Sequence, residues 1–476
     1  MLFGKEREIL GRVSENFAIR VLDREQGAVN KAVCRALTRS ERWHKRNCPL
    51  KPVLIVWLVI MMALYRDKSI PNVFRRMLGL FRLGEEDEGL SLRPITSEAL
   101  HHARRRLGSE PLRLLFEDLA NERGWTQTHF NGHRAVAVDG SYFRIPDTAS
   151  NEEFFGRKKG DRGRAGYPQM QSVALVDIAT HKVLDVEFQH CNHPEREGLK
   201  KLLDRHLGTG DLLLIDRGLP SYEILSFCES LDMKFLARLS GTWKPRFVKQ
   251  LGTGDVLVEI LPCKAARKQL KAPGGKCHRP MRLRLLSYEI GDGETVRLLT
   301  NLLCPEKYSA REIGLFYHER WEVELVYDEL KTHFVTVSNG KQPTHFRSKR
   351  PEGVLQEAYG MMIAYNLIRD LMVEAAQSEK DTEPLQLSFV DTIETVKVLA
   401  PSFETENPSK LRSAHIELLN EVAVCRLRPR RKRRYPRAVK IKMSNYKRKR
   451  GRSDGEYFDA AAQFSLVPPP GLARVA

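Results

Sequence analysis

Residues 1–125 carry apolar side chains at helical spacing, interrupted by turns that contain Pro or Gly. This repeat is typical of amphipathic helices, so the region is predicted to be helical throughout. The predicted helices are Glu15–Thr38, Val53–Tyr65, Ile70–Phe81, Thr96–Gly108 and Glu110–Gly124. The apolar run at 52–65 has fourteen residues. A membrane span needs about twenty, so we expect a buried helix there and no membrane partner.

Beyond residue 130 the pattern changes to short β-rich runs, which then alternate with helical stretches. The predicted strands are His133–Val138, Tyr142–Ile145, Gln171–Ile178, Lys182–Gln189, Leu212–Ile215 and Lys234–Leu239. Helices are predicted at Pro194–His206 and Ser221–Leu231. Strands that give way to strand–helix alternation indicate an α/β fold, with a mixed sheet flanked by helices.

Residues 241–304 differ again, with three short β-prone runs between turns rich in Gly, Pro and Lys. These runs are Val256–Leu261, Met281–Tyr288 and Val296–Asn301. We expect an all-β insertion here. The chain then returns to a helical pattern. Residues 378–476 are predicted to hold one or two helices, a basic segment and a Pro-rich end that is disordered.

Two long helices are predicted after the insertion. Residues 308–334 are rich in helix formers and predict about seven turns. Ser309 is the expected N-cap, with Glu312 completing a capping box. The second helix, Pro351–Ala376, is apolar over much of its circumference, which indicates a buried helix.

Four polar residues form a stripe on the first of these helices. At about 100° per residue they fall within roughly 60° of arc. They are Tyr317, Arg320, Glu324 and Lys331. The apolar residues Phe316, Val323, Val326, Tyr327 and Leu330 cluster on another side, which we expect to be buried. A carboxylate flanked by two cations and a phenol suits metal binding beside phosphates, although charge on a solvated helix face is also ordinary.

Two further acids directly follow predicted strands. Asp139 follows His133–Val138, and Asp216 follows Leu212–Ile215. Strand ends present functional side chains from a rigid scaffold, although an aspartate there is more often a turn or cap residue. Together with Glu324, these acids could converge from distant sequence positions.

The charge of the chain is concentrated in one segment. The net charge is +19, and residues 426–452 contain fifteen Lys or Arg and no acid, so the rest carries only +4 (19 minus 15). This predicts a dedicated segment that binds a polyanion. The eight Cys form no CxxC pair, so neither a zinc ribbon nor a disulfide framework is indicated. No signal-peptide pattern opens the chain, and we expect a cytoplasmic protein with reduced thiols.

The spacing Tyr-x2-Arg-x3-Glu-x6-Lys resembles the signature of the bacterial insertion-sequence transposases of the "insertion sequence four" family, in the DDE superfamily. AVDGSYFRIPDT and LLLIDRGLPSYEIL resemble the first and second catalytic motifs of that family. The resemblance covers about residues 130–375. It implies that the catalytic carboxylates are Asp139, Asp216 and Glu324. It also implies that Tyr317, Arg320 and Lys331 contact DNA phosphates near the cut end.

Three carboxylates suit phosphodiester chemistry on a pair of Mg²⁺ ions. Two ions about 3.5–4 Å apart can act at the nucleophile and at the leaving oxygen. Mg²⁺ prefers hard oxygen ligands, so His and Cys are not needed, and Mn²⁺ can substitute. The resemblance implies a ribonuclease-H-like core in which Asp139 bridges both ions, Asp216 binds one and Glu324 binds the other.

The resemblance also implies a domain plan and a set of partners. The plan is a helical DNA-binding domain (1–125), a ribonuclease-H-like catalytic core (126–240 and 305–376), the β-rich insertion (241–304) and a C-terminal region with the basic segment (377–476). The expected activity is cut-and-paste transposition, with cleavage at the terminal inverted repeats of the element and strand transfer into target DNA. We expect a homodimer on DNA and association with the nucleoid.

Several assignments stay open. Arg217 could hold a phosphate or form a salt bridge, and Asp328 is an alternative third ligand. The basic residues Arg430, Arg431, Lys432, Arg433 and Arg434 are expected to bind DNA, with or without end preference. Some relatives stack a flipped base on a Trp where this chain has Val296 and Arg297, so Trp243 is a candidate if it is not insertion core. The rival functions are a metal-dependent nuclease or resolvase on the same fold and a non-catalytic DNA-binding descendant.

Overall fold

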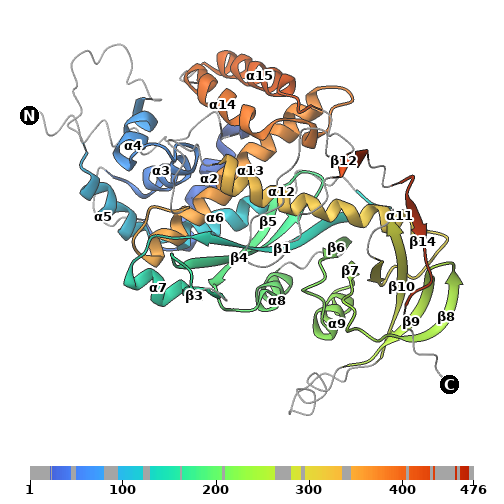
Figure 1. Cartoon of the computed structure of the whole chain (residues 1–476). Helices are drawn as coiled ribbons and strands as arrows, with labels where there is room; N and C mark the ends of the chain where they lie inside the picture. The colour runs from blue at the N-terminus through green and yellow to red at the C-terminus, as the bar shows by residue number, and fades with distance from the viewer. Residues whose placement is uncertain are drawn as a thin grey trace, which may run out of the picture. The chain divides into compact units, whose positions relative to one another are not determined.

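The chain divides into two compact units in the computed structural model (Figure 1). Unit 1 comprises residues 1–208 and 321–426, and unit 2 comprises residues 209–320 and 427–476. The structure describes residues 22, 24–43, 50–79, 95–121, 129–160, 163–205, 210–262, 280–290, 295–334, 345–403, 407–428, 433–434, 456–457 and 461–470.

The N-terminal part of unit 1 is helical, as predicted. Its helices are α2 (Arg24–Arg39), α3 (Pro52–Leu64), α4 (Ile70–Gly79), α5 (Ser97–Leu107) and α6 (Glu110–Asn121). Every residue of α3 is buried, which confirms the reading of its apolar run as a core helix. No helix in the described part of the chain is long and apolar enough to cross a membrane.

Helix α3 packs along the long helix α13 (Pro351–Ser378). The two backbones approach closely at Gly360, where an added Cβ would lie 2.7 Å from Cγ1 of Val59 and 3.0 Å from its carbonyl oxygen. Glycine inside a helix is unfavourable by about 0.5–1 kcal/mol relative to alanine. Its presence at this position is therefore explained by the packing of α13 against α3.

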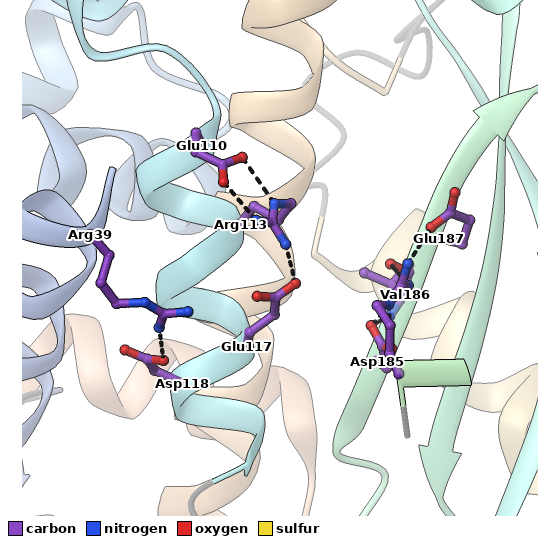
Figure 2. Close-up of polar contacts among 9 residues, drawn as sticks. Arg39, Glu110, Arg113, Glu117, Asp118, Asp185, Val186 and Glu187 are labelled. Atoms are coloured by element: carbon purple, nitrogen blue, oxygen red, sulfur yellow. Dashed lines mark hydrogen bonds and ion pairs between the residues drawn. The ribbon is translucent and has the colours of Figure 1, made fainter. Parts of the chain in front are cut away.

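One ion pair joins α6 to α2, and two others lie within α6 (Figure 2). Asp118 of α6 accepts from Arg39 of α2 over 2.5 Å, and Arg113 pairs with Glu110 at 2.6 Å and with Glu117. These side chains are partly exposed, and such pairs stabilise a fold by about 0–1 kcal/mol. The attachment of α6 to α2 therefore depends chiefly on the apolar side chains between them.

The sheet of unit 1 has the order β5-β4-β1, with antiparallel neighbours. Its strands are β1 (Arg134–Arg144), β4 (Gln169–Asp177) and β5 (Val183–His190), accompanied by α7 (Ala149–Phe155), the hairpin β2 (Lys159–Gly160) and β3 (Gly163–Arg164), and α8 (Glu195–Arg205). The two strands predicted at 133–138 and 142–145 are one strand. Pairing with β4 runs unbroken from Val136 to Arg144, so Gly140-Ser141 lies inside the strand and forms no turn.

Unit 2 contains a mixed sheet in the order β6-β7-β11-β10-β9-β8, in which only β6 and β7 are described as a parallel pair. Its elements are β6 (Asp211–Ile215), α9 (Tyr222–Ser230), β7 (Lys234–Arg238), β8 (Arg246–Gly252), β9 (Asp255–Ile260), β10 (Met281–Ile290) and β11 (Val296–Thr300). The described residues of 241–304 form strands and turns, as predicted. Because β11 pairs with β7, these strands extend the sheet that begins with β6.

The C-terminal end adds a strand to the same sheet. Strand β14 (Phe464–Leu466) pairs antiparallel with β10. Phe464 is buried and stacks on Tyr288, with ring centroids 4.8 Å apart. The predicted disorder of the Pro-rich end is therefore wrong for residues 461–470, because one aromatic side chain and a three-residue ladder fix them to the sheet.

The segment 308–334 is helical but not regular. It contains α11 (Ala310–Tyr317), the 3₁₀ turn η1 (His318–Trp321), α12 (Glu322–Asp328) and the π-helical turn η2 (Glu329–His333). Ser309 is the N-cap, as predicted, and accepts a hydrogen bond from the Glu312 amide over 3.2 Å. After α13, unit 1 continues with the 3₁₀ turns η3 (Pro384–Gln386) and η4 (Ala400–Phe403) and the helices α14 (Phe389–Leu399) and α15 (Pro408–Val424).

Candidate active site

Asp139 lies in the middle of β1, opposite Ala174 of β4. The prediction that it ends a strand is wrong, because the β1–β4 ladder continues five residues beyond it. Burial changes at this position, since Ala135–Val138 are buried and residues 139–142 are partly exposed. The carboxylate therefore sits where a rigid strand emerges from the core.

Helix α12 is fastened to β1 beside this aspartate. The buried hydroxyl of Tyr327 lies 3.2 Å from the carbonyl oxygen of Asp139 and 3.1 Å from that of Ser172. Glu324 lies one turn earlier on α12 and is partly exposed. The structure thus brings the helix that carries Glu324 onto the strand that carries Asp139, within unit 1.

Lys331 joins the same group from the π-helical turn. Its ammonium donates to Oγ of Ser141 and lies 5.3 Å from the ring centroid of Phe143. Burial lowers the pKa of Lys331 to about 8, although the nearby negative charge of Asp139 works in the opposite direction. A cation thus stands two residues along β1 from the candidate carboxylate.

Glu329, the first residue of the π-helical turn, is held by residues of the core. Glu329 accepts a hydrogen bond from the Tyr365 hydroxyl over 2.6 Å and forms an ion pair with Arg369. Burial alone would raise the pKa of Glu329, but the positive charge of Arg369 holds it at about 2. Glu329 lies between Glu324 and Lys331 in sequence, and π-helical turns are frequent at functional sites.

Unit 2 carries the remaining candidates of the motif. Asp216 directly follows β6, as predicted, and its Oδ1 lies 3.9 Å from Nε of Arg320. The Tyr317 hydroxyl donates to the carbonyl oxygen of Ile215 over 3.1 Å, which fastens α11 to the end of β6. Burial raises the pKa of Tyr317, so this hydroxyl stays a neutral donor.

The polar stripe is less exposed than a solvated helix face. Tyr317 and Arg320 are 5% and 9% exposed, whereas Glu324 and Lys331 are partly exposed. The five apolar residues predicted to face the core, Phe316, Val323, Val326, Tyr327 and Leu330, are all buried. The four stripe residues are therefore partly or fully buried, unlike the side chains of a solvated helix face.

Three further candidate residues lie at or near the protein surface. Arg217 is exposed in the turn after β6. Asp328 is exposed, and its Oδ1 accepts from the Thr332 hydroxyl over 3.1 Å. Trp243 is half-buried in a turn rather than in the core, and its carbonyl oxygen accepts from Arg297 over 3.5 Å.

One acidic residue beside the site was not singled out from the sequence. A Cβ built on Gly140 would lie 2.5 Å from Oε1 of Glu195, so the Glu195 carboxylate stands beside β1 next to Asp139. Glu195 opens α8 and is partly exposed. No motif marks it, because only the packing of α8 against β4 brings it to this place.

The family is decided by comparison with known proteins. Residues 130–367 match the family described as "Transposase DDE domain", and residues 26–117 match "Insertion element 4 transposase N-terminal". The chain belongs to the DDE transposases of the insertion element 4 family. It is 29% identical over 418 residues to the transposase InsG for insertion sequence element IS4 of Escherichia coli K12, a match that covers 87% of this chain and 90% of that protein.

Two further proteins are similar to this transposase. The putative transposase InsZ of Escherichia coli K12 is 31% identical over 199 residues, which covers 41% of this chain and 60% of that protein. A piggyBac transposase, solved in a synaptic complex with hairpin DNA, is 12% identical with a TM-score of 0.44 and covers 85% of this chain and 84% of its own.

The family confirms the predicted class and activity. The protein is a DNA transposase with a ribonuclease-H-like core, and hence an enzyme that cleaves phosphodiester bonds and transfers strands. The family acts on DNA and uses divalent metal ions. This membership favours the transposase over the rival interpretation as a nuclease or resolvase on the same fold.

The transposase supplies hard oxygen donors for such ions. Asp139 and Glu324 lie in unit 1 and Asp216 in unit 2. Within the described ranges, no three His, Cys, Asp or Glu side chains gather in a group that could hold a metal ion. The donor chemistry of the motif residues, carboxylates without thiols or imidazoles, fits Mg²⁺ or Mn²⁺.

The basic segment of the transposase is described only in part. Arg430, Arg431 and Lys432 lie outside the described residues. Arg433 and Arg434 form β12, which pairs antiparallel with β13 (Glu456–Tyr457).

Lys331 gives a direct test of the geometry on β1. In the metal-free transposase, its ammonium should lose its proton near pH 8. Because the charge of Asp139 favours the ammonium, the Asp139→Asn variant should lower the pKa of Lys331 further. The pH dependence of amine labelling, read peptide by peptide by mass spectrometry with Lys410 as an exposed internal reference, measures both values. An unchanged Lys331 titration in the variant would contradict the contact.

Proposed function

We propose that Asp139, Asp216 and Glu324 are the three catalytic carboxylates of this transposase, and that they hold two Mg²⁺ ions. The observation that carries the proposal is the attachment of α12 to β1 through Tyr327, which brings the Glu324 helix to Asp139. Asp216 enters from the end of β6, beside Arg320. When bound, the ions would act as Lewis acids toward the scissile phosphate and its nucleophile.

The cationic residues of the motif divide into two roles. Arg320 and Lys331 are proposed to contact DNA phosphates, since each stands beside one of the carboxylates. Tyr317 is proposed to serve the same contact by position, because its hydroxyl is already bound to the end of β6 and holds the helix that leads to Arg320. A buried cation interacts with phosphate more strongly than a solvated one, because less water screens it.

The partners follow from the same proposal. The substrates are the terminal inverted repeats of the element and a target DNA, and the reaction is cut-and-paste with a homodimer that pairs two ends. The helices at 1–125 are proposed to help recognise the ends, and the segments at 126–240 and 305–376 to form the catalytic core around the β-rich residues 241–304. The exposed Arg217 and the basic residues 430–434 of the C-terminal region at 377–476 are proposed to add non-specific affinity for the backbone.

A strand-transfer assay tests the activity itself. Matched inverted repeats in the DNA that flanks the gene supply the end sequence. Pre-cut ends with free 3′-hydroxyls, incubated with the protein, Mg²⁺ and a supercoiled target, should become joined to that target. A protein that nicks the ends but yields no joined product would overturn the cut-and-paste proposal, and Mn²⁺ in place of Mg²⁺ should support the same joining.

A further inference from the structure

A second cationic feature lies in unit 1, apart from the carboxylates. It is a pocket of about 480 Å³ between α5, the segment 347–350 and the first turn of α13. Five Arg and Lys side chains line it, against one carboxylate. The lining residues that matter below are Arg104, Arg105, Lys349, Arg350 and Glu352.

The inner wall of the pocket is a rigid, hydrogen-bonded frame. Arg104 is buried and donates to Gln356 over 3.2 Å and to Ser348 over 3.1 Å, and it pairs with Glu357 at 3.3 Å. Arg347 donates to two backbone carbonyl oxygens on the α3–α4 side, at 2.7 and 3.0 Å. The guanidinium groups of Arg104 and Arg347 are thus bound to protein acceptors, and they form a fixed wall of the pocket.

The outer wall of the pocket carries three cationic side chains that face solvent. Arg105, Lys349 and Arg350 are exposed. Within the described part of the chain, none of these three side chains donates a hydrogen bond or pairs with a carboxylate, whereas Glu352 accepts a hydrogen bond from the Ser109 amide over 2.5 Å. The three outer cations are therefore free to bind an anion, and the lining carboxylate is already occupied.

The pocket is joined to the strand of the candidate active site. His345 exchanges two backbone contacts with Arg144 at the end of β1: its Nδ1 accepts from the Arg144 amide over 2.9 Å, and its own amide donates to the Arg144 carbonyl over 2.7 Å. Burial lowers the pKa of His345 to about 4, so the ring stays a neutral acceptor. Arg144 lies five positions beyond Asp139 on β1, which is about 17 Å along the strand.

Three exposed cations around one pocket suit a DNA duplex, because each strand of B-DNA carries a phosphate for about every 3.4 Å of helix axis. We propose that the pocket of Arg105, Lys349 and Arg350 binds backbone phosphates of the transposon-end duplex whose cut site lies at Asp139. The inference rests on the proposed function, and it assigns the α5–α13 pocket a role in holding the DNA rather than in cutting it.

The chemistry favours phosphate over other anions. Guanidinium groups present planar donor pairs that match phosphate oxygens. Two Arg and one Lys on a wide, open rim suit a repeating backbone, and a backbone contact carries position without sequence information. The pocket should therefore contribute affinity and register for the end, and leave base recognition to other residues.

The test measures binding without cleavage. Full-length Glu324→Gln protein serves as the parent, and Arg105→Ala, Lys349→Ala and Arg350→Ala are combined in it. Binding to a labelled end duplex is followed by fluorescence anisotropy at several salt concentrations. Each lost phosphate contact should reduce the slope of log affinity against log salt by about 0.9, so the triple variant should lose about two to three units of slope and bind at least about tenfold more weakly at low salt.

A matched variant removes the same charge elsewhere. Lys380, Lys410 and Arg412 are exposed in unit 1 and lie outside the pocket, so their triple Ala variant should keep nearly the parental slope. Equal slopes in the parent and the pocket variant would overturn the inference, as would equal losses in both triple variants. If inorganic phosphate alone binds the parent but not the pocket variant while duplex affinity is unchanged, the pocket serves small phosphates and the DNA surface is rejected. None of these outcomes touches the cleavage tests of the carboxylates, so the two proposals fail separately.

Discussion

Replacing any one of Asp139, Asp216 or Glu324 by its amide is expected to abolish DNA cleavage and leave end binding nearly unchanged. An amide keeps the shape of the side chain but loses the charge that binds a divalent ion. Metal ions contribute several kcal/mol of transition-state stabilisation, and about 4 kcal/mol corresponds to about a thousandfold in rate. Cleavage of a labelled end duplex in Mg²⁺, with binding measured on the same DNA without metal, provides both readouts.

Asp328→Asn is the matched control for this series. Asp328 lies one turn beyond Glu324 and is exposed, with its carboxylate bound by Thr332. Its amide variant should cleave at nearly the parental rate. Full cleavage by Glu324→Gln together with loss in Asp328→Asn would move the third ligand to residue 328. Full cleavage by Asp139→Asn would remove β1 from the site.

Arg284→Ala is expected to destabilise unit 2 strongly. Arg284 is fully buried and forms a two-pronged ion pair with Asp255, at 2.8 and 2.5 Å, and its remaining nitrogen donates to the Tyr308 carbonyl over 2.7 Å. Removing one partner leaves a buried, uncompensated carboxylate, which costs about 3–5 kcal/mol. For a unit of this size that lowers the unfolding temperature by about 10 °C. Calorimetry or thermal circular dichroism measures the shift.

The partner variant separates charge from packing. Asp255→Ala should be destabilising to a similar degree, and the double variant Arg284→Met/Asp255→Ala should be less destabilised than the sum of the two single variants, because no charge is left buried. Additive effects would show that the two side chains do not depend on each other. An unchanged unfolding temperature in Arg284→Ala would contradict the buried pair itself.

Much of the fold could be predicted because the spacing of apolar residues along the chain indicates each helix and strand. The helices of the N-terminal region and the buried helix α13 follow from apolar spacing, and Asp216 was placed correctly because Leu212–Ile215 is a continuous apolar run that ends there. A fully buried strand and its boundary are both visible in such a run. These features need no knowledge of distant partners.

The errors arose where pairing overrides local chemistry. Gly140-Ser141 has the composition of a turn, yet β4 offers an unbroken ladder opposite it, so β1 continues through Asp139. Glu329, which opens the π-helical turn, is bound by Tyr365 and Arg369, which lie 36 and 40 residues further along the chain. The site beside Asp139 also gains Glu195 only through packing. The sequence around each of these positions does not predict its distant partner.

Strand β14 lies beyond the basic segment and belongs to the sheet of unit 2. Described residues on either side of it are held by the fold: Arg426 pairs with Leu387 in an isolated β-bridge, and Phe464 packs beside Gly314 and Tyr288. Deleting the chain from residue 427 would remove β14 and the buried Phe464 together with the positive charge. Replacing the arginines and lysines by neutral residues in the full-length chain therefore tests their binding without removing part of the sheet.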